Sequence, residues 1–266
     1  RLKALVSLHK EILTQGSLLA ELQAGLKPEV ILSTWGMPRL TDAELDAMPQ
    51  LKLVLYAAGD VRAFAEPIVA RGIPLVSAWR ANAIPVAQFA LAQILLAAKG
   101  WWGNVTRYKS DRHRRDVPVG PGCHELTVAL IGGGAISQLL IDHLKPFGIR
   151  VLLVDPYISE ERAAEMGVKK ASMEEAFSQA FIVSNHVPDN EETRGMIGAK
   201  HWRLMPLGGA FINTGRGQTL RNDEFIEVFQ ERPDLTALLD VTHPEPLPPD
   251  SPLWEMPNVH VSSHIA

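Results

Sequence analysis

Four stretches of this sequence carry side chains whose types and spacing could support chemistry. In the first, VALIGGGAIS at residues 128–137, an apolar run leads into a G-x-G-x-x-G-like cluster with glycines in the first and third places. A loop that leaves a strand and opens a helix directs free backbone N–H groups and the positive end of the helix dipole toward a pyrophosphate. We therefore expect the phosphates of a dinucleotide to lie against Gly132, Gly134, Ala135 and Ile136.

The sixth place of this pattern holds Ser137 instead of glycine. The third glycine of such a loop lets the helix pack closely on the strand and does not touch the phosphates. We therefore expect Ser137 to alter the local packing without removing the site.

Asp155 ends the next apolar run, RVLLVD, and follows Gly132 by 155 − 132 = 23 positions. An acid at this place can hydrogen-bond the ribose hydroxyls of adenosine, and it repels a 2′-phosphate, which favours NAD over NADP. The alternative interpretation is that Asp155 merely caps the turn that precedes Pro156.

The second and third stretches are FINTGRG, residues 211–217, and LLDVTHPEPLPPDSPLW, residues 238–254. Arg216 presents a planar fork that suits a carboxylate or a carbonyl, although a surface ion pair is the alternative. Asp240 ends a predicted strand, and Glu245 follows in a loop stiffened by prolines. Both acids are expected at the carboxyl edge of a sheet; the alternative is a proline-rich connector with solvated acids.

The fourth stretch, NVHVSSHIA at residues 258–266, contains His260 and His264. Their even separation predicts that both lie on the same face of a strand. A metal pair is poorly supported, because no third ligand stands at a recognisable spacing, and we expect no metal site. A general acid–base role for one histidine needs only a carboxylate partner, for which Glu245 is a candidate.

Alternating strands and helices must position these residues. In the second half of the chain, we expect six strands of a doubly wound parallel sheet, at residues 127–131, 150–155, 181–186, 210–215, 236–241 and 259–264. The first half predicts a smaller α/β unit with strands at residues 3–8, 30–34, 51–58 and 74–78 and helices at residues 10–25 and 42–48.

A long helix from about residue 85 to residue 109, apolar all round, is expected between the two series, with the domain boundary near Asn82. Its window at residues 84–102 approaches the length of a membrane span. Gln88, Gln93 and Lys99 interrupt that window, which favours a buried helix.

The bulk properties are those of a soluble two-domain protein. The chain has 266 residues, a formal net charge of −4 and 46% hydrophobic residues. The charge argues against nucleic acid as a main partner, and the single cysteine excludes an internal disulfide. We expect a cytoplasmic protein without a membrane partner.

Together, these stretches resemble the NAD-dependent D-isomer-specific 2-hydroxyacid dehydrogenases over nearly the whole chain. The most specific elements are FINTGRG, LLDVTHPEPLPPDSPLW and the terminal HIA, in that order and spacing. The resemblance implies a Rossmann cofactor domain at residues 82–266, a smaller flavodoxin-like substrate domain at residues 1–81, and NAD as the cofactor. It also implies a C-terminal return to the substrate domain that is missing from these 266 residues.

The resemblance implies that Arg216, Glu245 and His264 work together. His264 would exchange a proton with the substrate oxygen, Glu245 would stabilise the protonated imidazole, and Arg216 would orient a 2-keto or D-2-hydroxy acid. Further positions that the resemblance assigns to the cofactor are His186, Val187, Thr193, Thr214, Gly215 and Asp240.

In the first domain, YAAGDVRAF resembles the loop whose backbone N–H groups meet the substrate carboxylate, at Ala58, Gly59 and Asp60. Asp60 departs from the family pattern, because it places an acid beside an anion. Either its side chain turns away or the substrate is unusual.

The resemblance also implies a homodimer. Trp101 and Trp102 are candidates for the contact with the second subunit, and simple core packing is the alternative. Corepressors related to this family use the same fold to recognise partners. A dinucleotide-sensing binding protein is therefore the alternative function.

Overall fold

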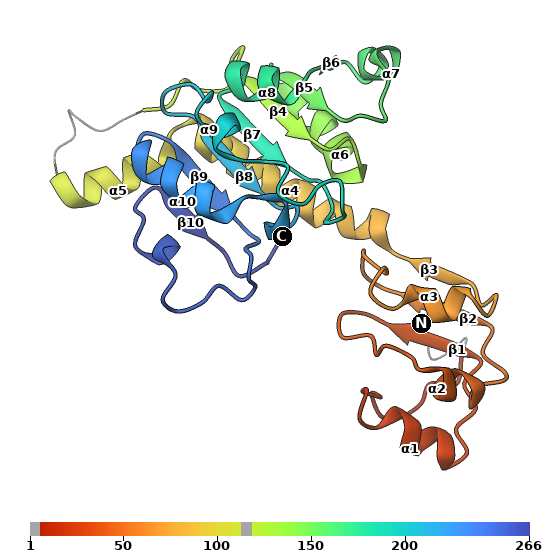
Figure 1. Cartoon of the computed structure of the whole chain (residues 1–266). Helices are drawn as coiled ribbons and strands as arrows, with labels where there is room; N and C mark the ends of the chain where they lie inside the picture. Colours follow the sequence, from red (N-terminus) through yellow and green to blue (C-terminus); the bar gives the residue numbers. More distant parts are fainter. Residues whose placement is uncertain (1–5, 113–118) are drawn as a thin grey trace. The chain divides into compact units, whose positions relative to one another are not determined.

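The computed structural model describes residues 6–112 and 119–266, which form two compact units, Arg1–Ala83 and Ile84–Ala266 (Figure 1). The boundary falls inside helix α4, Trp79–Ala98.

The first unit is built on a three-stranded parallel sheet in the order β1-β2-β3, with β1 at Val30–Ser33, β2 at Leu53–Tyr56 and β3 at Leu75–Ser77. Its helices are α1 (Leu18–Gln23), α2 (Asp42–Asp46) and α3 (Ala65–Val69). Val54 and Tyr56, on one face of β2, pack in a core with residues of these helices, among them Leu45 and Ile68. The strands expected at residues 30–34, 51–58 and 74–78 are confirmed in shortened form.

The opposite face of this sheet is apolar and open among the described residues. Val30 and Leu32 of β1 are 38% and 40% exposed, and Val76 of β3 is 52% exposed. The register pairs Val30 with Leu53, Leu32 with Leu55, and Leu55 with Val76, so all five side chains share one face.

Two expectations for this unit are not confirmed. The strand expected at residues 3–8 lies partly outside the described residues, and residues 6–8 are irregular. The helix expected at residues 10–25 is reduced to α1, because a turn occupies its first half: the Thr14 amide donates to Ser17 Oγ, and the Ser17 amide donates to the Thr14 carbonyl.

The second unit holds a seven-stranded parallel sheet in the order β10-β9-β8-β7-β4-β5-β6. The strand order reverses between β4 and β7, as in the Rossmann fold. The strands are β4 Thr127–Ile131, β5 Arg150–Val154, β6 Lys169–Lys170, β7 Ile182–Asn185, β8 Ala210–Asn213, β9 Thr236–Leu239 and β10 Val259–Val261. The predicted α/β class and the six expected strands are confirmed; the two-lysine edge strand β6 was not expected.

The expected helix at residues 85–109 is two helices, α4 and α5 (Trp101–Asp111). Gly100 separates them in the left-handed conformation with φ 67°. A Cβ at Gly100 would lie 2.6 Å from the Gly120 amide nitrogen, so both the backbone conformation and the packing require glycine here.

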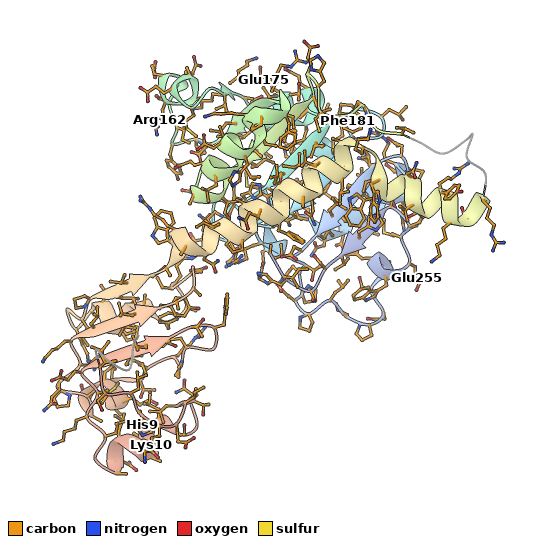
Figure 2. All side chains as sticks on the ribbon, turned by 180° about the vertical axis from the view of Figure 1, so that it is seen from behind. His9, Lys10, Arg162, Glu175, Phe181 and Glu255 are labelled. Atoms are coloured by element: carbon orange, nitrogen blue, oxygen red, sulfur yellow. The ribbon has the colours of Figure 1, made fainter. Side chains whose placement is uncertain are left out.

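Helices cover both faces of the large sheet. Val128 and Leu130 point into a core shared with α4 and α6 (Ala135–Leu144), whereas Ala129 and Ile131 point into the other core. The other core contains residues of α8 (Met173–Gln179), α9 (Ala199–Trp202) and α10 (Asn222–Glu231); α7 (Glu160–Glu165) follows β5. Figure 2 shows the ribbon of α4 running across one face of this sheet.

By length and composition α4 is long and apolar enough to cross a membrane. Ala87, Ala90, Ile94 and Ala98 on this helix are fully buried against the sheet core. Core helices pass the same test of length and composition, and α4 has the packing of such a helix.

Substitutions of Trp202 on α9 test the aromatic packing in the core of the second unit. It is fully buried against Phe211, Phe225 and Phe229, and its Nε1 has no hydrogen-bond partner. Trp202→Ala should lower the free energy of unfolding by about 3–5 kcal/mol in urea titrations. Trp202→Phe should cost far less, since it keeps a ring and removes an unpaired N–H; a loss below about 1 kcal/mol for Trp202→Ala would contradict this account.

Candidate functional site

The glycine loop joins β4 to α6 and is open at the helix end. Gly132 has φ 89°, and a Cβ there would lie 2.9 Å from Val187 Cγ1. Gly134 is the N-cap of α6, with no side chain capping the helix and nothing within 4 Å of an added Cβ. No N-cap side chain satisfies the first N–H groups of α6, which include those of Ala135 and Ile136, and the space beside Gly134 is open, as a pyrophosphate site requires.

Asp155 is tied to this loop. Its Oδ2 accepts the Gly133 amide at 2.7 Å, and its Oδ1 accepts the Tyr157 amide at 2.8 Å. Asp155 therefore does cap the turn, as the alternative interpretation states. Each carboxylate oxygen can accept a further hydrogen bond, so a ribose hydroxyl is still accommodated. The open helix end together with this acid fits a dinucleotide with an unmodified 2′-hydroxyl.

Ser137 is fully buried, and its hydroxyl donates to the Gly132 carbonyl. The side chain thus packs inside the protein and hydrogen-bonds the backbone at the start of the loop. The expectation that it changes the packing and leaves the phosphate side open agrees with this geometry.

His186 follows β7 and lies between two hydroxyl groups. Ser184 Oγ is 2.9 Å from Nε2, and Thr214 Oγ1 is 2.9 Å from Nδ1. Burial lowers the pKa of His186 from 6.5 to about 3, so the imidazole is neutral, donating at one nitrogen and accepting at the other. The loops after β7 and β8 are joined through this ring.

The remainder of the β7 loop is held by Thr193. Its hydroxyl donates to the Pro188 carbonyl at 2.6 Å and accepts the Asn190 amide at 2.9 Å. Val187 is buried. Within the described contacts, Thr193 shapes the loop that borders the site.

Arg216 follows β8 and is half-buried. Its Nη1 donates to the Gly215 carbonyl at 2.7 Å. Its guanidinium has further N–H donors for a ligand. Among the described residues, no acidic side chain forms an ion pair with Arg216, which disfavours the interpretation of Arg216 as half of a surface ion pair.

His264 and Glu245 are brought together. His264 Nδ1 lies 2.6 Å from Glu245 Oε1, and both side chains are partly exposed. Because Nδ1 faces the carboxylate, Nε2 is the nitrogen that can face a substrate. His264 has φ 58°, an uncommon conformation for a residue other than glycine.

Asp240 holds the segment that carries His264. The carboxylate is 1% exposed and accepts the Ser262 hydroxyl at 2.6 Å, the Ile265 amide at 2.9 Å and the Ala266 amide at 3.0 Å. A buried charge requires such partners. Asp240 therefore holds the Ser262 side chain before the histidine and the backbone amides after it.

The expectation that His260 and His264 share a strand face is wrong. Strand β10 ends at Val261, and His264 lies beyond it with a left-handed backbone. His260 instead packs against Trp102, with ring centroids 4.9 Å apart, and burial lowers its pKa. Among the described residues, no group of three or more potential ligands could hold a metal ion.

In the first unit, the Asp60 side chain turns onto Arg62. Arg62 Nε donates to Asp60 Oδ1 at 2.9 Å, and the Arg62 amide donates to the same oxygen at 3.0 Å. The neighbouring Gly59 carbonyl accepts the Ser77 hydroxyl at 2.7 Å. The charge of Asp60 is thus paired within the loop, which agrees with the first of the two outcomes expected for it.

Sequence reasoning missed several residues that support these positions. They are Ser77, Ser184, Asn185, Asn213, Thr219 and Ser262. Asn185 and Asn213 end apolar strands, and a polar residue at the end of a buried strand is the signal that could have found them.

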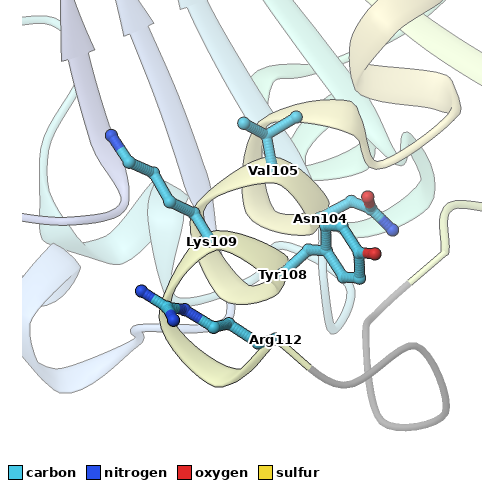
Figure 3. Close-up of a pocket in the computed structure, with 5 residues that line it drawn as sticks. All are labelled: Asn104, Val105, Tyr108, Lys109 and Arg112. Atoms are coloured by element: carbon cyan, nitrogen blue, oxygen red, sulfur yellow. The ribbon is translucent and has the colours of Figure 1, made fainter.

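Two of the hollows among the described residues lie on the second unit. One of about 460 Å³ is lined, among the described residues, by Asn104, Val105, Tyr108, Lys109 and Arg112 of α5 and its C-cap (Figure 3). None of these is a predicted site residue. The other, of about 410 Å³, is lined by Arg194, Gln218 and His243, which follow β7, β8 and β9. Open space therefore exists at the carboxyl edge of the sheet.

A family model described as D-isomer specific 2-hydroxyacid dehydrogenase, NAD binding domain, matches residues 91–266. The chain is 30% identical to a glyoxylate reductase of Korarchaeum cryptofilum, over 85% of this chain and 70% of that protein.

Two further similar proteins are covered by this chain to different extents. A D-3-phosphoglycerate dehydrogenase of Mycobacterium tuberculosis is 31% identical over 84% of this chain, which spans 43% of that longer protein. The crystal structure of a D-lactate dehydrogenase from Aquifex aeolicus, complexed with NAD and lactic acid, superimposes with a TM-score of 0.71 at 25% identity. That match covers 95% of this chain and 78% of the other.

Ser137 and Gly134 make a matched pair for the phosphate loop. Ser137→Gly should lower the free energy of unfolding by about 1–2 kcal/mol, since it removes a buried hydrogen bond and places glycine in a helix. NADH affinity, measured by fluorescence, should stay within about threefold. Gly134→Val should weaken NADH binding by about tenfold or more, because its side chain would fill the open space. Loss of NADH binding in Ser137→Gly would overturn this assignment.

His186 should remain neutral far into the acid range. Its folded-state pKa lies below the value of about 6.5 expected in the unfolded chain, so its contribution to stability is fully present above pH 6.5. That contribution is lost as the pH falls toward about 3, because the unfolded state then binds a proton that the folded state does not. NMR of the imidazole, assigned with His186→Gln, tests this; titration above pH 5 would contradict it.

Proposed function

Because the chain belongs to the D-isomer specific 2-hydroxyacid dehydrogenase family of NAD-dependent oxidoreductases, we propose that it interconverts a 2-keto acid and a D-2-hydroxy acid. The observation that carries this proposal is the contact of 2.6 Å between His264 and Glu245. Both residues lie beyond strands of the sheet whose β4 end carries the open glycine loop.

His264 acts as the general acid and base. NAD(H), when bound, supplies or accepts the hydride at the substrate carbon. In the direction of reduction, Nε2 gives its proton to the carbonyl oxygen, and in oxidation it takes that proton from the hydroxyl. Glu245 accepts a hydrogen bond from Nδ1, which holds the ring and stabilises its charged form.

Arg216 orients the substrate. Its planar fork can bind the carboxylate and the adjacent keto oxygen, which fixes the keto carbon and stabilises negative charge on the oxygen. The hydrogen bond to the Gly215 carbonyl leaves other N–H donors of the guanidinium for this contact.

The residues assigned to the cofactor lie at the carboxyl edge of the large sheet. The pyrophosphate is assigned to the loop at Gly132 and Gly134 and to the helix start at Ala135 and Ile136, and the adenosine ribose to Asp155. The open N-terminus of α6 supports this assignment. The walls of the nicotinamide side are assigned to His186, Val187, Thr193, Thr214, Gly215 and Asp240.

Residues 1–81 are assigned as the substrate domain, with Ala58, Gly59 and Asp60 in the loop that receives the carboxylate, and residues 82–266 as the cofactor domain.

We place the protein in the cytoplasm as a homodimer. Trp101 on α5 is 43% exposed, whereas Trp102 packs against His260, so Trp101 is the available contact. Trp101→Glu should convert a dimer to monomers in sedimentation experiments, because it buries a charge at the interface. A wild-type monomer, or an unaltered Trp101→Glu dimer, would contradict this part of the proposal.

The activity is tested with purified protein, NADH and a panel of 2-keto acids, by following the loss of nicotinamide absorbance. His264→Gln should lower kcat by about 100-fold or more and leave the Kd for NADH within about threefold. His260→Gln is the matched control, since His260 contacts Trp102 and not the site, and its kcat should be unchanged.

Absence of turnover by wild-type protein that binds NADH would count against the dehydrogenase. If His264→Gln also left the biological output unchanged, the result would favour the dinucleotide-sensing alternative.

A further inference from the structure

Three polar side chains lie fully buried behind the loop that carries Arg216: Asn185, Asn213 and Thr219 are each 0% exposed. Asn185 and Asn213 are the last residues of β7 and β8 and are register partners across the sheet. Polar groups buried in this way are hydrogen-bonded in nearly all proteins, so their partners show what they hold in place.

Thr219 and Asn213 hold the backbone at Arg216. The Thr219 hydroxyl donates to the Arg216 carbonyl at 2.6 Å, and Asn213 Nδ2 donates to the same carbonyl at 3.3 Å. Asn213 Oδ1 accepts the Gly215 amide at 3.1 Å. Side chains thus hold the peptide group that follows the Arg216 Cα and the peptide group that joins Thr214 to Gly215.

Asn185 joins this cluster to the neighbouring loop. Its Nδ2 donates to Asn213 Oδ1 at 3.0 Å and to Thr219 Oγ1 at 2.9 Å, and its Oδ1 accepts the Val187 amide at 3.4 Å. Because the single proton of the Thr219 hydroxyl goes to the Arg216 carbonyl, the hydroxyl can only accept from Asn185. The direction of each hydrogen bond is therefore set.

The two loops are also in close backbone approach. A Cβ on Gly215 would lie 2.7 Å from the Val187 carbonyl oxygen and 3.2 Å from Asn185 Nδ2. A side chain at position 215 would therefore clash with the β7 loop, and Asn213 holds the Gly215 amide in place beside that loop.

We propose that Asn185 and Thr219 are positioning residues, which hold the Arg216 backbone against the Val187 loop and so set where the guanidinium meets the substrate carboxylate. This inference rests on the proposed function of Arg216. A misplacement of about 1 Å at an orienting group can cost about 100-fold in rate, so a buried cluster far from solvent can still control substrate recognition.

Thr219→Val and Thr219→Ser form a matched pair, because the first keeps the shape and removes the hydroxyl, and the second keeps the hydroxyl. For Thr219→Val, we expect the KM for a 2-keto acid to rise about tenfold while the Kd for NADH changes less than about twofold. Thr219→Ser should recover most of the wild-type KM. Asn185→Asp, which removes the amide donor, should change the KM in the same direction as Thr219→Val.

Hydrogen exchange of the Gly215 amide in the ligand-free protein gives a readout that is independent of turnover. Exchange should accelerate about tenfold or more in Thr219→Val and return toward the wild-type rate in Thr219→Ser. Equal exchange rates in wild-type protein and Thr219→Val would contradict the claim that the buried polar cluster supports this loop.

Faster exchange with an unchanged KM would overturn the positioning role, as would equal KM values for Thr219→Val and Thr219→Ser. A wild-type protein that reduces no 2-keto acid would instead overturn the proposed function on which this inference rests. The exchange comparison separates that failure from a failure of the cluster itself.

Discussion

The parallel register of the large sheet is the constraint on which the rest of the second unit depends. Across six neighbouring strands the last paired residues are aligned: Val154, Ile131, Asn185, Asn213, Leu239 and Val261. The next residue along each strand is therefore at the same edge: Asp155, Gly132, His186, Thr214, Asp240 and Ser262. Residues up to 130 positions apart in sequence are brought together because parallel strands present their carboxyl ends to one side.

Buried polar groups convert this edge into fixed positions. Asp240 holds the segment around His264 through three hydrogen bonds, and the amide cluster holds the Arg216 backbone. Glu245, in contrast, is partly exposed and reaches His264 from a loop. In a low-dielectric interior, unpaired polar groups are costly, so the satisfied networks favour one arrangement of the loops. Stability and the geometry of the site thus come from the same contacts.

The sequence predicted the parts that follow from local pattern. Hydrophobic runs located the strands of the large sheet, and the glycine cluster located the open end of α6. It did not predict the roles of Asn185 and Thr219, because their hydrogen bonds join segments 34 positions apart and leave no local signature. The sequence did not predict that the long helix breaks at Gly100, because helix propensity does not report the close approach of Gly120. The even spacing of His260 and His264 gave a wrong prediction of a shared strand face, because β10 ends at Val261, before His264.

The central claim is that the carboxyl edge of this sheet binds NADH and a 2-keto acid so that Arg216 and His264 meet the same substrate. The most direct measurement is a crystal structure of the full chain with NADH and oxamate, an unreactive isostere of a 2-keto acid. The account predicts pyrophosphate at the N-terminus of α6 and oxamate in hydrogen-bond contact with both Arg216 and His264 Nε2. Pyrophosphate bound elsewhere, or oxamate that touches neither side chain, would contradict it.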